Sequence, residues 1–342
     1  MRRARLLLPV LCSAALLASC GGSDTPTASD GPGTGARGAS STTAGPTTTT
    51  APAAPTAQVA SWKLPSALSR TACAVQDNRI RCFSGLNAAK TSTPAIIQID
   101  PVAGTVTPAG TLATAVHDAT GTEFSGRSLL IGGGSHEVGT TAVVDVSGAT
   151  PQQAGSLPEP RSDLSSIVSG KRLIVLGGYD GTAITPGVLA STDGATFTTI
   201  GALVTPVRYG AVAEAKGTVY VFGGKTRVKG ADSQTADIQA VDTATGKVTV
   251  VGSFPTPIGH MVAVTLRGQI YVMGGRTGLG LKLTDSAAVW HFDPATGTVT
   301  QVGALPSPLT DSTAAVVADT AYLIGGERSA TPLTQVVTVT AA

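Results

Sequence analysis

The chain has 342 residues, of which 13% are charged and 4% are aromatic, and its formal net charge is +2. Three of its 23 basic residues, Arg2, Arg3 and Arg5, lie at the amino terminus, so the remainder carries 20 basic against 21 acidic side chains. A nearly neutral chain lacks the clustered Lys and Arg that phosphate binding requires, which argues against a nucleic-acid-binding protein.

The amino terminus has the layout of an export signal. The arginines precede an apolar run at residues 6–17, which is too short to span a bilayer as a helix. The run ends in Leu17, Ala18, Ser19 and Cys20, and this tetrapeptide resembles the lipobox of bacterial lipoproteins. The resemblance implies a signal peptide at residues 1–19, lipidation of Cys20, and an extracytoplasmic protein anchored to a bacterial membrane, at the outer membrane or cell surface. An ordinary signal peptide with a chance cysteine is the alternative.

Residues 20–57 form a segment of low complexity. They are almost entirely Gly, Ser, Thr, Pro, Ala and Asp, with no aromatic residue and no apolar periodicity. Such a composition cannot bury enough apolar surface to fold, so we expect a disordered tether between the lipid and a folded domain at residues 58–342.

The rest of the chain repeats one unit six times. Five apolar runs end in a Gly-Gly pair, and a degenerate sixth run ends in Ser84-Gly85. The spacings between successive pairs are 48, 45, 46, 51 and 51 residues, measured between the first members: Ser84, Gly132, Gly177, Gly223, Gly274 and Gly325. Turn-forming residues six positions earlier predict a hairpin at the start of each unit. The pattern predicts an all-β fold of six blades.

The segments after the pairs extend the pattern. Residues 289–297 and 97–101 each contain an apolar strand that ends in Asp-Pro. With its apolar strand, Gly-Gly pair, variable loop and Asp-Pro turn, the unit resembles the kelch repeat, although the Trp that kelch repeats favour in their fourth strand is usually replaced. The resemblance implies a six-bladed kelch-type β-propeller.

The two ends of the domain are expected to meet. The last unit stops after its third strand, and residues 58–66 match residues 301–307, which follow the fourth strand of the preceding unit. We therefore expect the amino-terminal strand to complete the last blade, which removes an exposed sheet edge.

Two cysteines remain in the predicted domain. If Asp77 and Asn78 form a two-residue turn, Cys73 directly faces Cys82 at a site where side chains approach closely. Outside the cytoplasm this favours a disulfide over two free thiols. We expect no metal site at these cysteines, because suitably spaced His or carboxylate ligands are lacking.

One ionisable residue per unit lies 14 to 16 positions before the first member of each pair. The six are Arg70, His117, Arg161, Arg208, His260 and Asp311. In a four-stranded meander they fall where the innermost strand begins, so we expect them to ring one mouth of the central channel. Either they are struts that bond the backbone between blades, or they form an anion-binding pocket in which Arg grips a carboxylate.

Two classes of function are compatible with these features. The first is a surface-tethered binding module for a protein, peptide or glycan, which uses the loops on one propeller face and needs no cofactor. The second is a sugar-modifying enzyme resembling the six-bladed kelch sialic-acid mutarotases, in which Glu159, Asp163 or Glu214 would move protons. A kelch-type copper oxidase has less support, because the chain has five tyrosines and dispersed histidines.

Overall fold

The computed structural model describes residues 53–135, 138–280 and 282–342. One compact unit spans Thr50–Ala342, and the other, Met1–Thr49, lies outside the described residues. The expected signal peptide and Cys20 therefore lie outside them too, with most of the expected tether. Within the described ranges, no helix is long and apolar enough to cross a bilayer.

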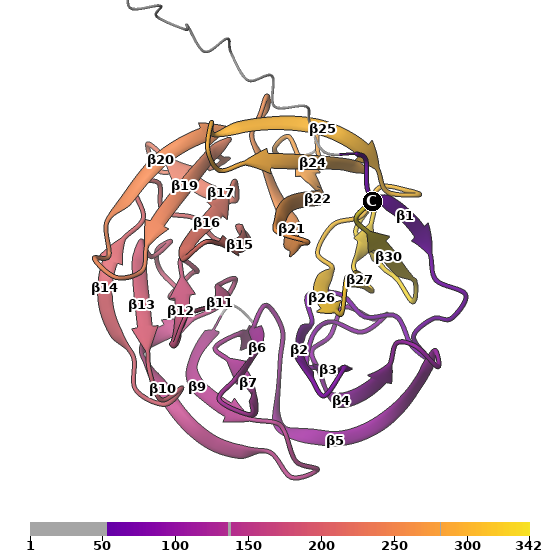
Figure 1. The fold of residues 1–342 in the computed structure, drawn as a ribbon. Helices are drawn as coiled ribbons and strands as arrows, with labels where there is room; N and C mark the ends of the chain where they lie inside the picture. The colour runs from indigo at the N-terminus through magenta and orange to yellow at the C-terminus, as the bar shows by residue number, and fades with distance from the viewer. Residues whose placement is uncertain (1–52, 136–137, 281) are drawn as a thin grey trace, which may run out of the picture. The chain divides into compact units, whose positions relative to one another are not determined.

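Six antiparallel sheets are arranged around a central axis as the blades of a propeller (Figure 1). Blade 1 contains β2 (Ala72–Gln76), β3 (Arg79–Phe83), β4 (Thr93–Asp100) and β5 (Thr105–Val116). Blade 2 contains β6 (Thr120–Phe124), β7 (Arg127–Ile131), β9 (Val138–Asp145) and β10 (Gln152–Arg161). Blade 3 contains β11 (Ser165–Ser169), β12 (Arg172–Leu176), β13 (Gly187–Ser191) and β14 (Thr198–Ala202).

The second half of the ring has the same plan. Blade 4 contains β15 (Ala211–Ala215), β16 (Thr218–Phe222), β19 (Asp237–Asp242) and β20 (Val248–Ser253). Blade 5 contains β21 (Ile258–Leu266), β22 (Gln269–Thr277), β24 (Ala288–Asp293) and β25 (Thr298–Ala304). Blade 6 contains β26 (Thr313–Val317), β27 (Thr320–Ile324), β30 (Val336–Thr340) and β1 (Thr56–Val59). Short strands in the loops are β8 (Gly134–Ser135), β17 (Lys225–Val228), β18 (Ala231–Gln234), β23 (Thr284–Asp285), β28 (Glu327–Arg328) and β29 (Thr331–Pro332).

The Gly-Gly pairs join neighbouring blades. Gly178 donates its N–H to the carbonyl of Val207 at 3.0 Å, and Gly224 donates to Ile258 at 2.9 Å. In each case the acceptor belongs to the segment that enters the next blade. The first member of the pair has a positive φ, and a Cβ on Gly177 would collide with the Val207 carbonyl. Glycine is required because the backbone of the next blade occupies the space of a side chain.

The amino-terminal strand closes the ring as the sequence predicts. β1 pairs antiparallel with β30, and Gln58 lies opposite Thr338. The strand begins at Thr56, two residues before the expected start of the domain. All six buried hydrophobic clusters lie between residues 64 and 339. A fragment of residues 50–342 therefore contains the whole closed core.

The first hairpin has the predicted register and disulfide. Asp77 and Asn78 both have a positive φ, as a two-residue turn requires. Cys73 lies directly opposite Cys82, their Cα atoms are 4.1 Å apart, and the two sulfurs are bonded.

Candidate functional site

The loops that enter the blades and the loops that follow the Gly-Gly pairs meet on one face of the ring. Isolated bridges join Ser69 to Leu86 and Arg208 to Lys225, one from each kind of loop. We call the opening of the central channel on this face the mouth. The hairpins between the first and second strands lie on the opposite face.

Six residues with left-handed backbone surround the mouth, and we call them the mouth ring. Their φ values lie between 50° and 60°, although none of them is glycine. Each lies fourteen residues before the first member of its blade's pair. The members are Arg70, Asp118, Asp163, Tyr209, His260 and Asp311.

A closed cycle of backbone hydrogen bonds holds the mouth ring. Each member donates its N–H to the carbonyl of the member in the preceding blade, over distances of 2.8 to 3.3 Å, and Arg70 completes the cycle by donating to Asp311. The left-handed conformation costs a residue with a side chain about 1–2 kcal/mol, and here the six bonds offset that cost. Strained backbone of this kind is concentrated at functional sites, which makes the mouth ring the first candidate.

The structure places three of the six predicted site residues in the mouth ring. Arg70, His260 and Asp311 line the channel cavity. His117 and Arg208 each precede a ring member by one residue, and their backbones pair with Gly134 and Lys225 instead. Arg161 precedes its ring member by two residues. The side chains of His117 and Arg208 still border the mouth ring, because His117 Nε2 lies 3.6 Å from Asp118 and Arg208 donates to Asp163 at 3.1 Å. The expected place at the mouth is corrected for Arg161.

Arg161 is buried between blades because its position belongs to an apolar series. The residue sixteen positions before the pair is aliphatic in the other five blades: Leu68, Val116, Val207, Ile258 and Leu309. The Arg161 side chain is 1% exposed, and it donates to the carbonyls of Gly177 and Gly187 at 3.1 and 2.8 Å and to Glu159 at 2.7 Å. Burial lowers the pKa of its guanidinium. Arg161 therefore has the structural role of bonding backbone carbonyls between blades.

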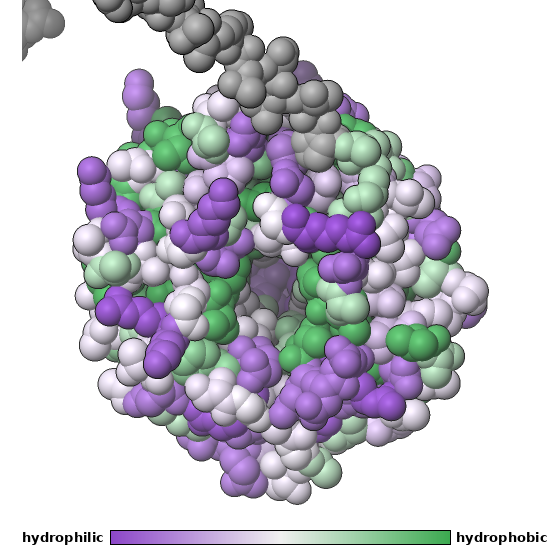
Figure 2. All heavy atoms as spheres, in the orientation of Figure 1, coloured by the Kyte–Doolittle hydropathy of each residue, from purple (hydrophilic) through white to green (hydrophobic). Residues whose placement is uncertain are grey.

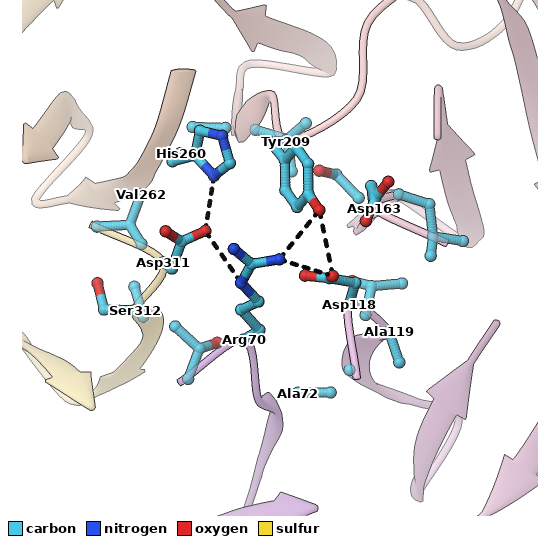
Figure 3. A pocket seen from close by; sticks show the side chains of 18 of the residues that line it. Arg70, Ala72, Asp118, Ala119, Asp163, Tyr209, His260, Val262, Asp311 and Ser312 are labelled. Atoms are coloured by element: carbon cyan, nitrogen blue, oxygen red, sulfur yellow. Dashed lines mark hydrogen bonds and ion pairs between the residues drawn. The ribbon is translucent and has the colours of Figure 1, made fainter. Parts of the chain in front are cut away.

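Arg70 extends across the mouth from blade 1 (Figure 3). Its Nη1 donates to Asp118 at 3.2 Å and to Tyr209 of the opposite blade at 3.3 Å. Its Nε donates to Glu327 at 3.3 Å and lies 3.8 Å from Asp311. Burial lowers the pKa of Arg70, but the surrounding carboxylates outweigh burial and raise it. The guanidinium is charged, and its Nε and Nη1 face the carboxylates of Asp118, Asp311 and Glu327.

Two carboxylates and a phenol meet on one side of Arg70. The Tyr209 hydroxyl donates to Asp118 at 3.2 Å, and Asp163 accepts a bond of 3.1 Å from Arg208. Burial and the nearby Asp163 raise the pKa of Asp118 well above its ordinary value. Burial and the two carboxylates also raise the pKa of Tyr209. Both shifts favour the protonated forms of Asp118 and Tyr209.

A histidine and a carboxylate meet on the other side. His260 Nδ1 lies 2.6 Å from Asp311 Oδ1, and its ring stacks on Tyr209 with the centroids 4.2 Å apart. Burial raises the pKa of Asp311, but His260, Arg70 and Arg276 outweigh burial and hold it below its ordinary value. Asp311 is thus an anion that fixes the imidazole. In Figure 3 this pair and the Asp118 group flank Arg70.

The mouth ring encloses a cavity of about 220 Å³. Figure 2 shows the molecule hollowed at the centre of the ring, with apolar and polar groups at the opening. Below the mouth ring, blades 2 and 3 contribute the hydroxyls of Thr120, Ser165 and Ser166, whereas blades 4 and 5 contribute Val212 and Ala263. The cavity therefore has a hydroxyl-lined side and an apolar side.

The proton carriers considered from the sequence are dispersed. Asp163 lines the cavity, whereas Glu159 binds Arg161 and Glu214 accepts the N–H of Gly217 at a hairpin turn. The sequence pattern did not identify Asp118 and Tyr209 as ring residues, because His117 and Arg208 are ionisable residues that stand one position before them. A constant spacing of fourteen identifies all six members of the mouth ring. Among the residues that the structure describes, no three His, Cys, Asp or Glu side chains are grouped to hold a metal ion.

Comparisons with known proteins agree with the architecture. The Kelch motif family model matches residues 257–306, which span blade 5. No curated protein sequence matches the chain. A solved structure of YjhT has a TM-score of 0.69 at 14% sequence identity and covers 81% of this chain and 98% of that chain. The described chain is a six-bladed β-propeller with a Kelch motif in blade 5, and its amino-terminal strand closes the last blade.

Proposed function

We propose that the propeller is a binding module that holds a small, uncharged, hydroxyl-rich group, such as one sugar unit of a glycan, at the mouth. The observation that carries this proposal is the cavity of about 220 Å³ enclosed by the mouth ring. Pockets for drug-sized ligands have volumes of about 300–1,000 Å³, so this cavity suits a smaller group.

The charge pairing at the mouth favours a neutral ligand. Arg70 is surrounded by Asp118, Asp311 and Glu327, and Arg208 is paired with Asp163. An anionic ligand would have to displace carboxylates that are already desolvated and paired, which is costly. A hydroxyl group can donate to a carboxylate and accept from a guanidinium without breaking either ion pair.

The two sides of the cavity favour a sugar among neutral ligands. A pyranose ring has hydroxyl groups at its rim and C–H groups on its faces. The hydroxyls of Thr120 and Ser166, which bond each other at 2.8 Å, would form a further bond to the rim, and Val212 and Ala263 would contact a face.

A glycan array probed with the fragment of residues 50–342 tests this function. A bound glycan should be held several-fold to about tenfold more weakly by Tyr209→Phe, because the change removes one hydroxyl from the cavity. Tyr179→Phe is the matched control, since that hydroxyl donates to the Gly181 carbonyl outside the cavity. The proposal fails if no glycan binds, or if the two variants bind equally well.

A sugar-modifying enzyme is the second candidate, and one observation favours it. Asp118, whose pKa is raised by burial and by Asp163, lines the same cavity as the His260–Asp311 pair. Interconversion of sugar anomers needs a base that takes the proton of the anomeric hydroxyl and an acid that protonates the ring oxygen. NMR exchange spectroscopy on a bound sugar should then show faster anomer exchange, which Asp163→Asn should slow. Exchange at the uncatalysed rate would eliminate this candidate.

We also propose that the module is exported and held at a bacterial membrane by acyl chains on Cys20. The support is the lipobox at residues 17–20. Labelled palmitate should be incorporated into the wild-type protein and not into Cys20→Ala. Label and membrane association that survive this change would contradict the anchor.

A further inference from the structure

Two neighbouring loops on the mouth face, those of blades 4 and 5, have more residues between the Gly-Gly pair and the third strand than the loops of the other blades. In blade 4 the chain between β16 and β19 forms the β17–β18 hairpin, whose turn contains Lys229 and Gly230 with positive φ. In blade 5 the loop between β22 and β24 contains Gly278 and Gly280, also with positive φ. Blades 4 and 5 adjoin, because Gly224 donates to the carbonyl of Ile258.

The tips of these loops carry exposed aliphatic side chains. Val228 is 55% exposed, Leu279 is 47% exposed and Leu283 is 48% exposed. Exposure of three large aliphatic side chains to water is energetically unfavourable. Nothing within the described chain covers these side chains on the two adjacent tips.

Cations flank these aliphatic side chains. Arg227 and Lys229 lie beside Val228 in the sequence, and Lys282 lies beside Leu283. Arg227 is paired with Asp232, whereas neither Lys229 nor Lys282 has an acidic partner among the described residues. The tips therefore present unpaired positive charge together with apolar surface.

We propose that these tips bind an anionic membrane surface. Aliphatic side chains that enter the headgroup region, with Lys and Arg against lipid phosphates, are the features of interfacial binding. An interface with another protein is usually enriched in aromatic residues and depleted in Lys at its core, and these tips contain Lys and no aromatic residue. The surface consists of Arg227, Val228, Lys229, Leu279, Lys282 and Leu283.

Co-sedimentation of the fragment of residues 50–342 with lipid vesicles tests the proposal. This fragment contains the closed core and lacks both Cys20 and the apolar amino terminus, so neither can mediate binding. It should bind vesicles of phosphatidylcholine with roughly one third phosphatidylglycerol, bind pure phosphatidylcholine at least tenfold more weakly, and lose affinity as salt rises.

Two double variants separate the contributions of charge and apolar surface. Lys229→Glu with Lys282→Glu should weaken binding about tenfold or more, since each Lys near an anionic surface contributes about fivefold. Leu279→Ser with Leu283→Ser should weaken it to a similar extent. The matched control is Val102→Ser with Lys171→Glu, which changes an 87% exposed valine and an exposed lysine on the hairpin face, and it should bind like the wild type.

Three results would overturn the proposal. The first is no binding to anionic vesicles, and the second is an equal loss in the control variant. The third is binding to soluble poly-L-glutamate without binding to vesicles, which would assign the tips to an acidic protein. Thermal melting of each variant establishes that it is folded. If a double variant melts early, the single change Lys282→Glu replaces it and should still weaken vesicle binding about fivefold or more.

Discussion

Asp311 is a buried carboxylate of the mouth ring with several cationic neighbours. Its side chain is 2% exposed, and it accepts hydrogen bonds from His260 at 2.6 Å and from Thr310 at 3.1 Å. Arg70 and Arg276 each lie 3.8 Å from it. A buried anion among several cations holds the other charges in place, so its removal leaves them uncompensated.

Asp311→Asn is predicted to destabilise the fold by about 3–5 kcal/mol at pH 7, the usual cost of removing one partner from a buried ion pair. The pKa of Asp311 is lower in the folded than in the unfolded chain. Its stabilisation is therefore complete above the unfolded-state pKa, near 4, and is lost as pH falls toward the folded-state value. Denaturant unfolding measures the difference in unfolding free energy between the wild type and Asp311→Asn. This difference should be smaller by about 1 kcal/mol at pH 3 than at pH 7. An equal difference in unfolding free energy at both pH values would contradict this role of Asp311.

At the residue scale, the sequence locates part of the site, for a physical reason. Arg70, His260 and Asp311 were predicted because ionisable side chains recur near the start of each innermost strand. The type of a side chain does not reveal its direction, however. Arg161 lies two residues from the channel position and is buried between blades, whereas the ring position of blade 4 belongs to Tyr209, which is uncharged at neutral pH and follows the charged Arg208.

At the scale of the strand and the turn, the predictions depend on periodicity. The second strand and the hairpin of each blade were predictable because the Gly-Gly pair and the turn residue recur at a fixed separation. The loop hairpin β17–β18 was not predicted, because the segment after each pair differs from blade to blade in length and composition. Without a repeated pattern, the loop segments of different blades cannot be aligned with one another, so their strands cannot be predicted from the repeat.

Gly177→Ala is predicted to destabilise the propeller more than Gly170→Ala. Both glycines have a φ of 58°, so the added methyl group costs each about 1–2 kcal/mol through the backbone. Gly170 has open space around it, whereas a Cβ on Gly177 meets the Val207 carbonyl, which accepts the bond from Gly178. We expect a further loss of about 1–3 kcal/mol at Gly177, measured by denaturant unfolding. Equal losses would show that the pair is not a link between blades.

Reduction of the Cys73–Cys82 disulfide is predicted to lower the melting temperature without opening the ring. The bond closes a short loop and should contribute about 2–3 kcal/mol. The strands that it joins keep their other paired positions, such as Val75 opposite Ile80. Thermal melting with and without reductant measures the effect. Free thiols that titrate in the native protein would contradict the pairing.

At the scale of the whole molecule, stability depends on closure. An apolar residue lies twenty positions before each pair and is buried between blades: Leu64, Leu112, Leu157, Leu203, Phe254 and Leu305. Each contact needs a neighbouring blade, so the ring is stable only when all six blades adjoin. The sequence predicted this closure because the repeats leave the last unit one strand short and the amino terminus supplies a matching segment.

A fragment of residues 61–342, which lacks β1, is predicted to melt at a lower temperature than the fragment of residues 50–342 and to aggregate at lower protein concentration. Removal of β1 exposes the edge of β30, including the backbone of Thr338 and Val337 opposite Gln58 and Val59. Thermal melting and light scattering compare the two fragments. If they behave alike, β1 does not stabilise the ring.

An NMR titration locates the ligand on the propeller. The ¹⁵N-labelled fragment of residues 50–342 is titrated with a glycan that it binds. If the ligand binds at the mouth, the largest shift changes should occur at the backbone amides of the mouth ring, whose N–H groups form one cycle of hydrogen bonds: Arg70, Asp118, Asp163, Tyr209, His260 and Asp311. Shift changes confined to the hairpin face or to the outer strands would contradict binding at the mouth.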